Sequence, residues 1–261
     1  MSSLILGGEL IGDQALVESG RCVLRQMRDT LSRRGFIHEA NDCYLPHTMY
    51  PLASIVAWAK DAECRELAQA GLDRIWADLL GHWHPNLGRK LGPSARDYTQ
   101  GRLSSKGWLM LLSYVFGPDA LPGWLNLDDI FEPEKTPAER KMQWPHGEGS
   151  SWNLGFLARV SAQPFIVPEV LKPWAVAKPY PFEIIGTNEF GNMLEIYEEV
   201  RPDGTKIQHG LDNVQFAGGP HLLTTYMEED WGMGTADQRL LGGCPNNHWQ
   251  LSYRKQRPLN D

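Results

Sequence analysis

The chain has 261 residues, of which 42% are hydrophobic and 22% are charged, and its formal net charge is −7. These values are ordinary for a globular protein with a real core. The acidic balance and the lack of a long basic run argue against nucleic acid and anionic membrane as main partners. Ten tryptophans could stack on sugar rings, although a core role is expected for most of them.

The N-terminal stretch and the cysteines bear on the cellular compartment. MSSLILGGELIGDQ has neither a basic region nor a sustained apolar run, so it predicts no signal peptide and no transmembrane helix. The chain as given is therefore expected to be cytoplasmic. Its four cysteines are widely spaced and form no CxxC pair, which predicts neither a disulfide framework nor a zinc knuckle. Cys22 and Cys64 fall on apolar helical positions and are expected to be buried thiols. No metal or other cofactor is expected.

The first half of the chain has the 3.6-residue period of amphipathic helices. A first helix is predicted from Asp13 to Arg34, with Gly35 as its stop. A second, strongly apolar helix is predicted over 46–60, with Pro51 near its first turn, where the missing N–H costs little. The apolar face of the first helix is predicted to hold Leu16, Val23, Met27 and Leu31.

A third helix is predicted to start after Asp61, a good N-cap, and to run to about His82. A fourth is predicted over 104–116. The buried stripe of the third helix is predicted to consist of Leu67, Leu72, Ile75, Trp76 and Leu79.

The hydrophobic period changes from 3.6 to 2 in the last third of the chain. FEIIGT predicts a strand, and NMLEIYEEVR and KIQHG predict a hairpin around Asp203-Gly204. HLLTTYMEE, WGMGTA and HWQLSYRKQ predict further strands. Five prolines in 164–182 predict a linker. The sequence thus predicts an α+β protein with a helical domain (1–163), a Pro-rich linker (164–182) and an antiparallel β domain (183–261).

Residues 41–51, NDCYLPHTMYP, form the first candidate site. Tyr44, His47 and Tyr50 are three residues apart, so they share one face if the segment is helical, and Asn41 precedes them. These groups suit proton abstraction next to a carboxylate. The amide and a cation would neutralise the carboxylate, a His or Tyr would take the proton, and a Tyr would protonate the leaving oxygen. The alternative is that Asn41 is an N-cap and the tyrosines belong to the core.

The second candidate site lies in residues 82–101. Here Arg96, Asp97 and Tyr98 follow a Gly-Pro turn. Arg96 could hold a carboxylate or sulfate bidentately and Tyr98 could transfer a proton; a local salt bridge beside a rim aromatic is the alternative. His82 and His84 form H-x-H at a helix end, where their side chains diverge. A capping histidine and a surface histidine are therefore expected in preference to a metal pair.

The third candidate site is WPHGEGSSW, residues 144–152. His146 and Glu148 alternate with glycines and are flanked by Trp144 and Trp152, which is typical either of a sugar-binding rim or of a loop with packed tryptophans. Three strand residues are weaker candidates, since strand aromatics usually pack: His221, Tyr226 and His248.

With these loops and the order of helices before strands, the chain resembles the heparinase II/III-like group of polysaccharide lyases. The resemblance is carried by NDCYLPHTMYPLASIVAWA, HWHPNLGRKLGPSARDYT and TTYMEEDWGMGTADQRLLGG. It implies an α/α toroid followed by an antiparallel β-sandwich, with the sugar in the cleft between them. It also implies β-elimination on uronic acids. By this resemblance the catalytic residues are Asn41, His47 and Tyr50 or Tyr44, with Arg96 and Tyr98 as partners.

Two other functions stay open at this point. A glycoside hydrolase on the same scaffold needs two carboxylates that flank the bond, and Asp97 with Glu148 is the best pair. The other is a non-catalytic sugar-binding protein or a degenerate homologue. In each case the expected partner is a polysaccharide or oligosaccharide, and a partner chain or oligomer is also open.

Overall fold

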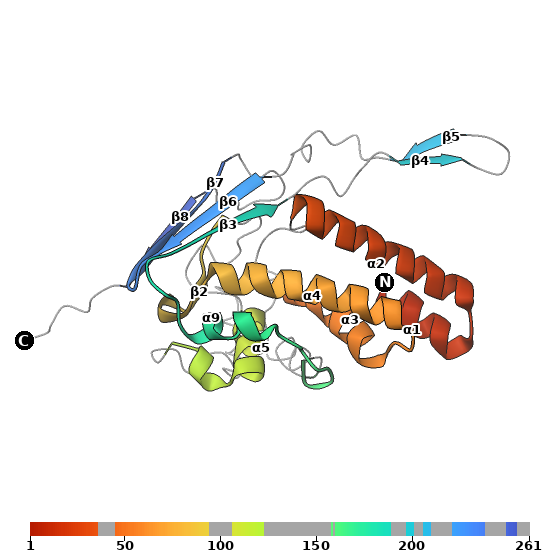
Figure 1. Ribbon diagram of the computed structural model, residues 1–261, viewed down its shortest axis with the longest axis horizontal. Helices are drawn as coiled ribbons and strands as arrows, with labels where there is room; N and C mark the ends of the chain where they lie inside the picture. The colour runs from red at the N-terminus through yellow and green to blue at the C-terminus, as the bar shows by residue number, and fades with distance from the viewer. Residues whose placement is uncertain are drawn as a thin grey trace, which may run out of the picture.

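The computed structural model describes residues 1–35, 45–93, 106–122, 158, 160–188, 197–200, 206–209, 221–237 and 249–254. Helices dominate the first half and antiparallel strands the second, which confirms the predicted α+β class (Figure 1). None of the helices in these ranges is long and apolar enough to cross a membrane. The longer helices are α1 (Ser2–Ile11), α2 (Gln14–Arg34), α3 (Leu45–Trp58), α4 (Ala62–His82) and α5 (Lys106–Phe116).

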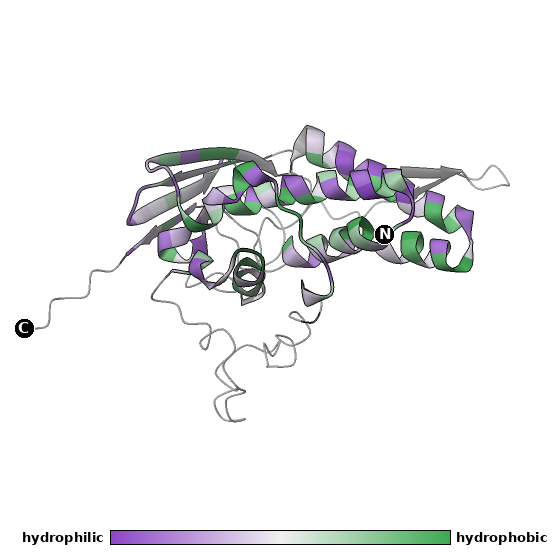
Figure 2. Cartoon of the chain, turned by 60° about the horizontal axis from the view of Figure 1, so that its bottom comes forward, coloured by the Kyte–Doolittle hydropathy of each residue, from purple (hydrophilic) through white to green (hydrophobic). Residues whose placement is uncertain are grey.

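Helix α2 begins and ends as predicted. The Asp13 carboxylate caps it by accepting hydrogen bonds from the backbone N–H groups of Ala15 (2.9 Å) and Leu16 (3.1 Å). Gly35 ends it with a φ of 86°, a backbone conformation that favours glycine. Purple and green residues alternate around α2, as expected of an amphipathic helix (Figure 2).

Two expectations for α2 are wrong by about one helical position. Its buried face holds Val17, Leu24 and Leu31, whereas Val23 is 40% exposed. Cys22, next to Val23, is also exposed, so only Cys64 of the two expected buried thiols is buried. The predicted face is correct at Leu31 and at Met27, which is half-buried and packs against the core, and it is wrong at Val23.

Helices α3 and α4 form the centre of the helical part. Because α3 begins at Leu45, Pro51 lies inside the helix and not in its first turn, which corrects the prediction. The Asp61 carboxylate caps α4 by accepting from the Cys64 N–H at 2.8 Å, and the stripe predicted for α4 is buried. Arg25 joins α2 to α4 through two hydrogen bonds to the Glu63 carboxylate, at 2.8 and 2.9 Å. Helix α1, which packs on α2, was not predicted.

The Pro-rich segment 164–182 packs against the helices. It contains η3 (Glu169–Leu171) and α9 (Pro173–Val176), and both contact α4. Ala175 is fully buried, and its carbonyl oxygen accepts a hydrogen bond from Trp83 Nε1 at 3.0 Å. The segment is thus a packed strap along α4; the domain boundary expected there stays a prediction.

The predicted strands form, and all their pairings are antiparallel. β3 (Phe182–Asn188), β6 (His221–Met227), β7 (Trp231–Ala236) and β8 (Trp249–Tyr253) make one sheet in the order β3-β6-β7-β8. β4 (Tyr197–Val200) pairs with β5 (Lys206–His209) as the predicted hairpin requires, although its turn lies outside the described residues. One hairpin was not predicted: β1 (Trp83–His84) pairs with β2 (Arg89–Lys90), and η1 (Pro85–Leu87) lies between them. A further short helix, η2 (Pro118–Ala120), follows α5.

The four-stranded sheet lies against the C-terminal end of α4 (Figure 1). The last turn of α4 touches β3 so closely that a Cβ on Gly81 would collide with the Ile184 side chain. Immediately after α4, the β1–β2 hairpin carries the chain across the sheet. This junction positions the candidate site.

Candidate functional site

Buried polar and charged side chains gather at the junction of α4, the β1–β2 hairpin and the sheet. Burying such groups is costly unless they are paired, so a cluster of them marks either a structural network or a functional site. Within the described residues, the members with at most 8% exposure are Asp78, His82, His84, Lys90, Lys178, Thr225 and Ser252.

Glycines allow the hairpin to lie directly on the sheet. A Cβ on Gly232 would collide with Leu91, and a Cβ on Gly234 would collide with the Gly92 backbone. Gly92 itself has a φ of 108°, and a Cβ there would lie 2.9 Å from Thr225 Oγ1. The alternation of WGMGTA therefore does more than form a strand, because its two glycines admit the segment that carries His82 and His84.

His82 ends α4 and is held between the helix and β6. Its Nδ1 lies 2.7 Å from Thr225 Oγ1, and its Nε2 lies 3.8 Å from Asp78 Oδ1, one turn back on α4. Burial lowers the pKa of His82 to about 4, against the opposing pull of the Asp78 carboxylate. The imidazole is therefore neutral at neutral pH.

The Asp78–His82 pair leaves polar atoms unused. Asp78 Oδ2 and His82 Nε2 are buried and make no hydrogen bond, and Arg74 reaches Asp78 Oδ1 only at 3.8 Å. Gly186 of β3 faces both groups: a Cβ there would stand 3.3 Å from His82 Nε2 and 3.5 Å from Asp78 Oδ1. Gly186 therefore adds no side chain between β3 and this pair.

Only one tautomer of His84 matches the hydrogen-bond partners of its two ring nitrogens. Its Nε2 lies 2.8 Å from the Glu228 carbonyl oxygen, which can only accept, so Nε2 carries the proton and donates. Nδ1 is then an acceptor, and it receives the Tyr180 hydroxyl at 3.2 Å and the Leu87 N–H at 3.4 Å. Burial lowers the pKa of His84, which keeps this neutral form.

Tyr180 is the half-buried partner in this pair. Its ring centroid lies 5.3 Å from that of His84. Burial, and then the negative charges of Glu229 and Asp230, raise the pKa of Tyr180 above its usual value. The phenol therefore keeps its proton and can act as a proton donor, whereas a phenolate base is disfavoured.

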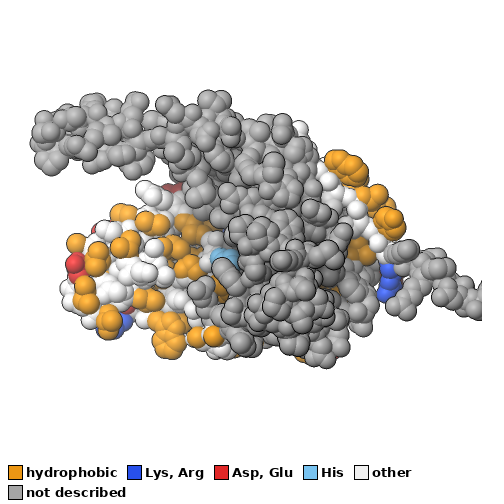
Figure 3. All heavy atoms as spheres, turned by 180° about the vertical axis from the view of Figure 1, so that it is seen from behind, with side chains coloured by type: hydrophobic (Ala, Val, Ile, Leu, Met, Phe, Trp, Pro, Cys, Tyr) orange, Lys and Arg blue, Asp and Glu red, His pale blue; other side chains and the backbone are white. Residues whose placement is uncertain are grey.

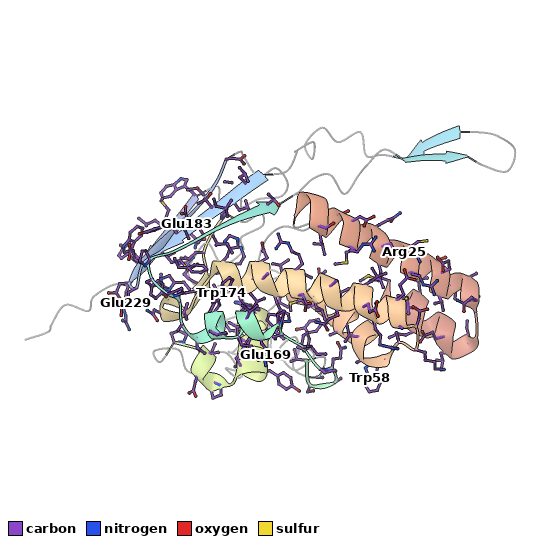
Figure 4. The ribbon with its side chains drawn as sticks, viewed as in Figure 1. Arg25, Trp58, Glu169, Trp174, Glu183 and Glu229 are labelled. Atoms are coloured by element: carbon purple, nitrogen blue, oxygen red, sulfur yellow. The ribbon has the colours of Figure 1, made fainter. Side chains whose placement is uncertain are left out.

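Lys178 closes the end of α4 from the other side. Its ammonium donates to the Leu80 carbonyl oxygen, in the last turn of the helix, where a positive charge is favourable. It also lies 5.0 Å from the ring centroid of Trp174 and 4.7 Å from that of Phe182. Trp174 stands beside the sheet end of α4 (Figure 4). Burial lowers the pKa of Lys178 to about 7.

Two residues of the predicted catalytic set fall in the described ranges. His47 is half-buried on α3, and Tyr50 is buried in the helical core, 5.9 Å from the Phe165 ring centroid. Their own ring centroids lie 6.1 Å apart with the rings edge-on. Their catalytic roles stay predictions. The other predicted site residues lie outside the described residues: Asn41, Tyr44, Arg96, Tyr98, Trp144, His146, Glu148 and Trp152.

The remaining candidates divide in the same way. Asp97 and His248 lie outside the described residues, and His221 is described only in its backbone on β6. His82 and His84 diverge as expected, but the expectation of a surface histidine is wrong, since both are buried. No group of three or more His, Cys, Asp or Glu side chains in the described ranges is placed to hold a metal ion.

Sequence reasoning missed Tyr180, Lys178 and Asp78. The first two lie in the Pro-rich segment, which was interpreted as a linker. For Asp78 a signal existed, because it lies four residues before His82 on a helix whose neighbouring positions are apolar. A carboxylate and an imidazole on one buried helical face indicate a polar contact within the core.

The fold and the junction together define an α+β protein with a buried network of acid–base groups where its longest central helix meets an antiparallel sheet. Comparisons with protein-family models, curated proteins and solved structures found no match for this chain.

Proposed function

We propose that the protein is a polysaccharide lyase that cleaves uronate-containing glycans by β-elimination. In this proposal it belongs to the heparinase II/III-like group, the helices are part of an α/α toroid, and the sheet is part of a β-sandwich. The single observation that carries the proposal is the Tyr180–His84 pair: a protonated, half-buried phenol held by a neutral imidazole at the junction of helices and sheet.

In β-elimination a base removes the proton next to the uronate carboxylate, a carbon–carbon double bond forms, and the bond to the glycosidic oxygen breaks. The leaving oxygen needs a proton. Tyr180 can donate it, because its phenol is protonated at neutral pH and its hydroxyl is positioned 3.2 Å from His84 Nδ1. When the hydroxyl turns to the glycan, His84 Nδ1 keeps the Leu87 N–H as a donor, so the imidazole is not left unpaired.

The other roles belong to residues that the sequence predicts. His47 or a tyrosine of the 41–51 segment takes the proton, and Asn41 and Arg96 neutralise the carboxylate. Lys178 does not fit that role, because its ammonium is buried against Leu80 and two aromatic rings.

A non-catalytic sugar-binding protein is the second candidate. The observation that favours it is the environment of His84, which is fully buried and has both ring nitrogens engaged by protein groups. Such a histidine can serve only to hold Tyr180 in place, and Tyr180 would then be a hydrogen-bonding rim residue.

The test is a screen of the purified protein against alginate, glucuronan, heparin-type, ulvan-type and pectic polymers, followed by the ultraviolet absorbance of an unsaturated uronate. We expect absorbance with at least one polymer. In Tyr180→Phe we expect kcat to fall by about 100-fold or more, the loss typical of a removed general acid. The matched control is Tyr114→Phe, which changes an exposed tyrosine on α5 and should leave kcat unchanged.

Other outcomes separate the alternatives. New reducing ends without unsaturation would indicate a hydrolase. Tryptophan quenching by oligosaccharides without turnover would indicate the binding protein. Full activity in Tyr180→Phe would remove this residue from the mechanism.

A further inference from the structure

The two faces of the four-stranded sheet differ in a way that is unusual for a sheet packed on helices. On the inner face, cross-strand rows follow the register Met227↔Gly232↔Ser252 and Thr225↔Gly234. These residues are buried, and most are small. Met227 and Leu223 are the bulky buried side chains that β6 adds to this face. The outer face carries seven exposed apolar side chains: Ile185, Leu222, Trp231, Met233, Trp249, Leu251 and Tyr253.

The register joins the five exposed apolar side chains of β7 and β8 into one continuous patch, whereas Thr224 and Thr235 separate Ile185 and Leu222 from it. Tyr226, Met233 and Leu251 lie in one cross-strand row, and Trp231 pairs with Tyr253 next to it. The ring centroids of Tyr226 and Trp231 are 5.6 Å apart. In Figure 3 hydrophobic side chains gather along the right-hand outline of the molecule, where the sheet lies. We call this patch the outer sheet face.

The outer sheet face is too large to be ordinary surface. Trp249 is 67% exposed and Tyr253 is 70% exposed. An aromatic side chain can bury roughly 150–250 Å². With three exposed aromatic and two other apolar side chains, the continuous patch reaches on the order of 600 Å² per partner, the lower end of what a standard interface buries. Monomeric proteins rarely expose apolar patches of this size.

Its composition is that of a protein interface core. Trp, Tyr and Met are enriched in such cores, and charged residues are depleted. The seven exposed side chains include no charged residue. Acidic side chains lie at the ends and edge of these rows: Glu183 on the edge strand β3, Glu228 just after β6 and Asp237 just after β7.

We propose that the outer sheet face binds the same face of a second copy of this chain. Two sheets packed face to face lie about 10 Å apart with interdigitating side chains, which is the arrangement of a β-sandwich. Each copy would supply one of the two layers. The contact would be isologous, so the exposed apolar side chains of one copy meet the same side chains of the other.

The test is sedimentation velocity of the full chain at concentrations from about 1 to about 100 μM, a range in which interfaces of this size usually associate. We expect a dimer. Trp249→Lys puts a charge into the face twice, once for each copy, and should raise the dimer Kd by at least about 30-fold, as loss of a tryptophan hot spot does. Trp58→Lys is the matched control, because Trp58 is 65% exposed on the side of the helical part opposite the sheet (Figure 4), and should leave the Kd unchanged.

Circular dichroism first shows that each variant is folded. If Trp249→Lys is not folded, Tyr253→Lys at the end of β8 replaces it. A monomeric wild type at every concentration overturns the proposal, and so does a dimer that Trp249→Lys or Tyr253→Lys leaves intact. A monomer whose tryptophan fluorescence responds to an oligosaccharide, with the response lost in Trp249→Lys, would assign the face to a glycan instead. The result is independent of lyase activity, so failure of either proposal is visible without the other.

Discussion

The helical part and the sheet differ in what stabilises them. In the described residues, the main core cluster runs through the helices and the strap, with Trp76, Trp83 and Trp108 fully buried. The sheet has a core cluster of its own with a single buried residue, Leu223, against which Ala236 packs. The helical part can therefore hold its shape through its own apolar contacts. The sheet depends on what lies against each of its faces.

This difference bears on the site. Helix α4 is fixed along one side by the core, so the positions of Asp78 and His82 follow from a rigid element. Thr225 and the Glu228 carbonyl come from the sheet, and they reach α4 and the hairpin only because the sheet is held close. A change that loosens the sheet should disturb the histidines before it disturbs the helices.

The largest expected effect on stability comes from removing a buried tryptophan from the helical core. Trp76 is fully buried, with ring centroids 5.9 Å from Trp108 and 5.7 Å from Phe116. Trp76→Ala should lower the free energy of unfolding by about 3–5 kcal/mol, because it removes a large apolar group and leaves a cavity. Urea denaturation measures this. Trp58→Ala, at an exposed tryptophan on α3, should stay within about 0.5 kcal/mol of wild type. Equal losses in the two variants would contradict the core assignment.

The sequence predicts those elements that are encoded locally and fails where a partner element decides the outcome. Periodicity and caps located α2 and α4, because Asp13, Asp61 and Gly35 are local signals that each helix carries in its own sequence. Alternation and turn residues located the strands for the same reason. The face of α2 was misjudged near Val23, since the partner helix decides which of two similar stripes is buried.

The junction could not be predicted, because its contacts are long-range. His82 and Thr225 are 143 positions apart, and His84 and Tyr180 are 96 apart. Nothing in the local sequence of the Pro-rich stretch indicates that Tyr180 and Lys178 lie beside the end of a helix. The glycines of WGMGTA are visible in the sequence, but the groups that pack on them, the Leu91 side chain and the Gly92 backbone, come from the other half of the chain.

The second prediction sharpens the comparison at the junction. The pKa of His82 is about 4 in the folded protein and about 6.5 when unfolded. As the pH falls, the unfolded chain therefore binds the proton first, and stability is lost between about pH 6.5 and pH 4. Integrated over that window, the loss is about 3 kcal/mol.

The measurement is urea denaturation of wild type and His82→Gln at several pH values. Carboxylates distant from His82 contribute alike to both proteins, so the difference between the two profiles reports on the imidazole and its contact with Asp78. We expect the free energy of unfolding of the wild type to fall relative to that of His82→Gln as the pH drops from about 6.5 to about 4. Parallel profiles would mean that His82 takes up its proton in the folded state at an ordinary pH, and that the junction is open to water.

The smallest expected effect tests the sheet side directly. Gly234→Ala adds one methyl group, which would collide with the Gly92 backbone and so cannot be relieved by a side-chain rotation. The hairpin must shift away from β7, at a cost of about 1–3 kcal/mol in the free energy of unfolding. Gly7→Ala is the control, because nothing lies within 4 Å of a Cβ at that position in α1, and the better helix former should raise stability by up to about 1 kcal/mol.

The two variants compare how the sheet and the helical part tolerate an added methyl group. Thermal denaturation should show Gly234→Ala unfolding below wild type and Gly7→Ala at or above it. Because the shifted hairpin carries His84, the variant should also weaken the Glu228 and Tyr180 hydrogen bonds, which the imidazole resonances would report in an NMR titration. A Gly234→Ala protein with wild-type stability and an unchanged His84 titration would mean that the sheet does not need the close approach of the hairpin. The dependence of the sheet on its inner neighbour would then have to be abandoned.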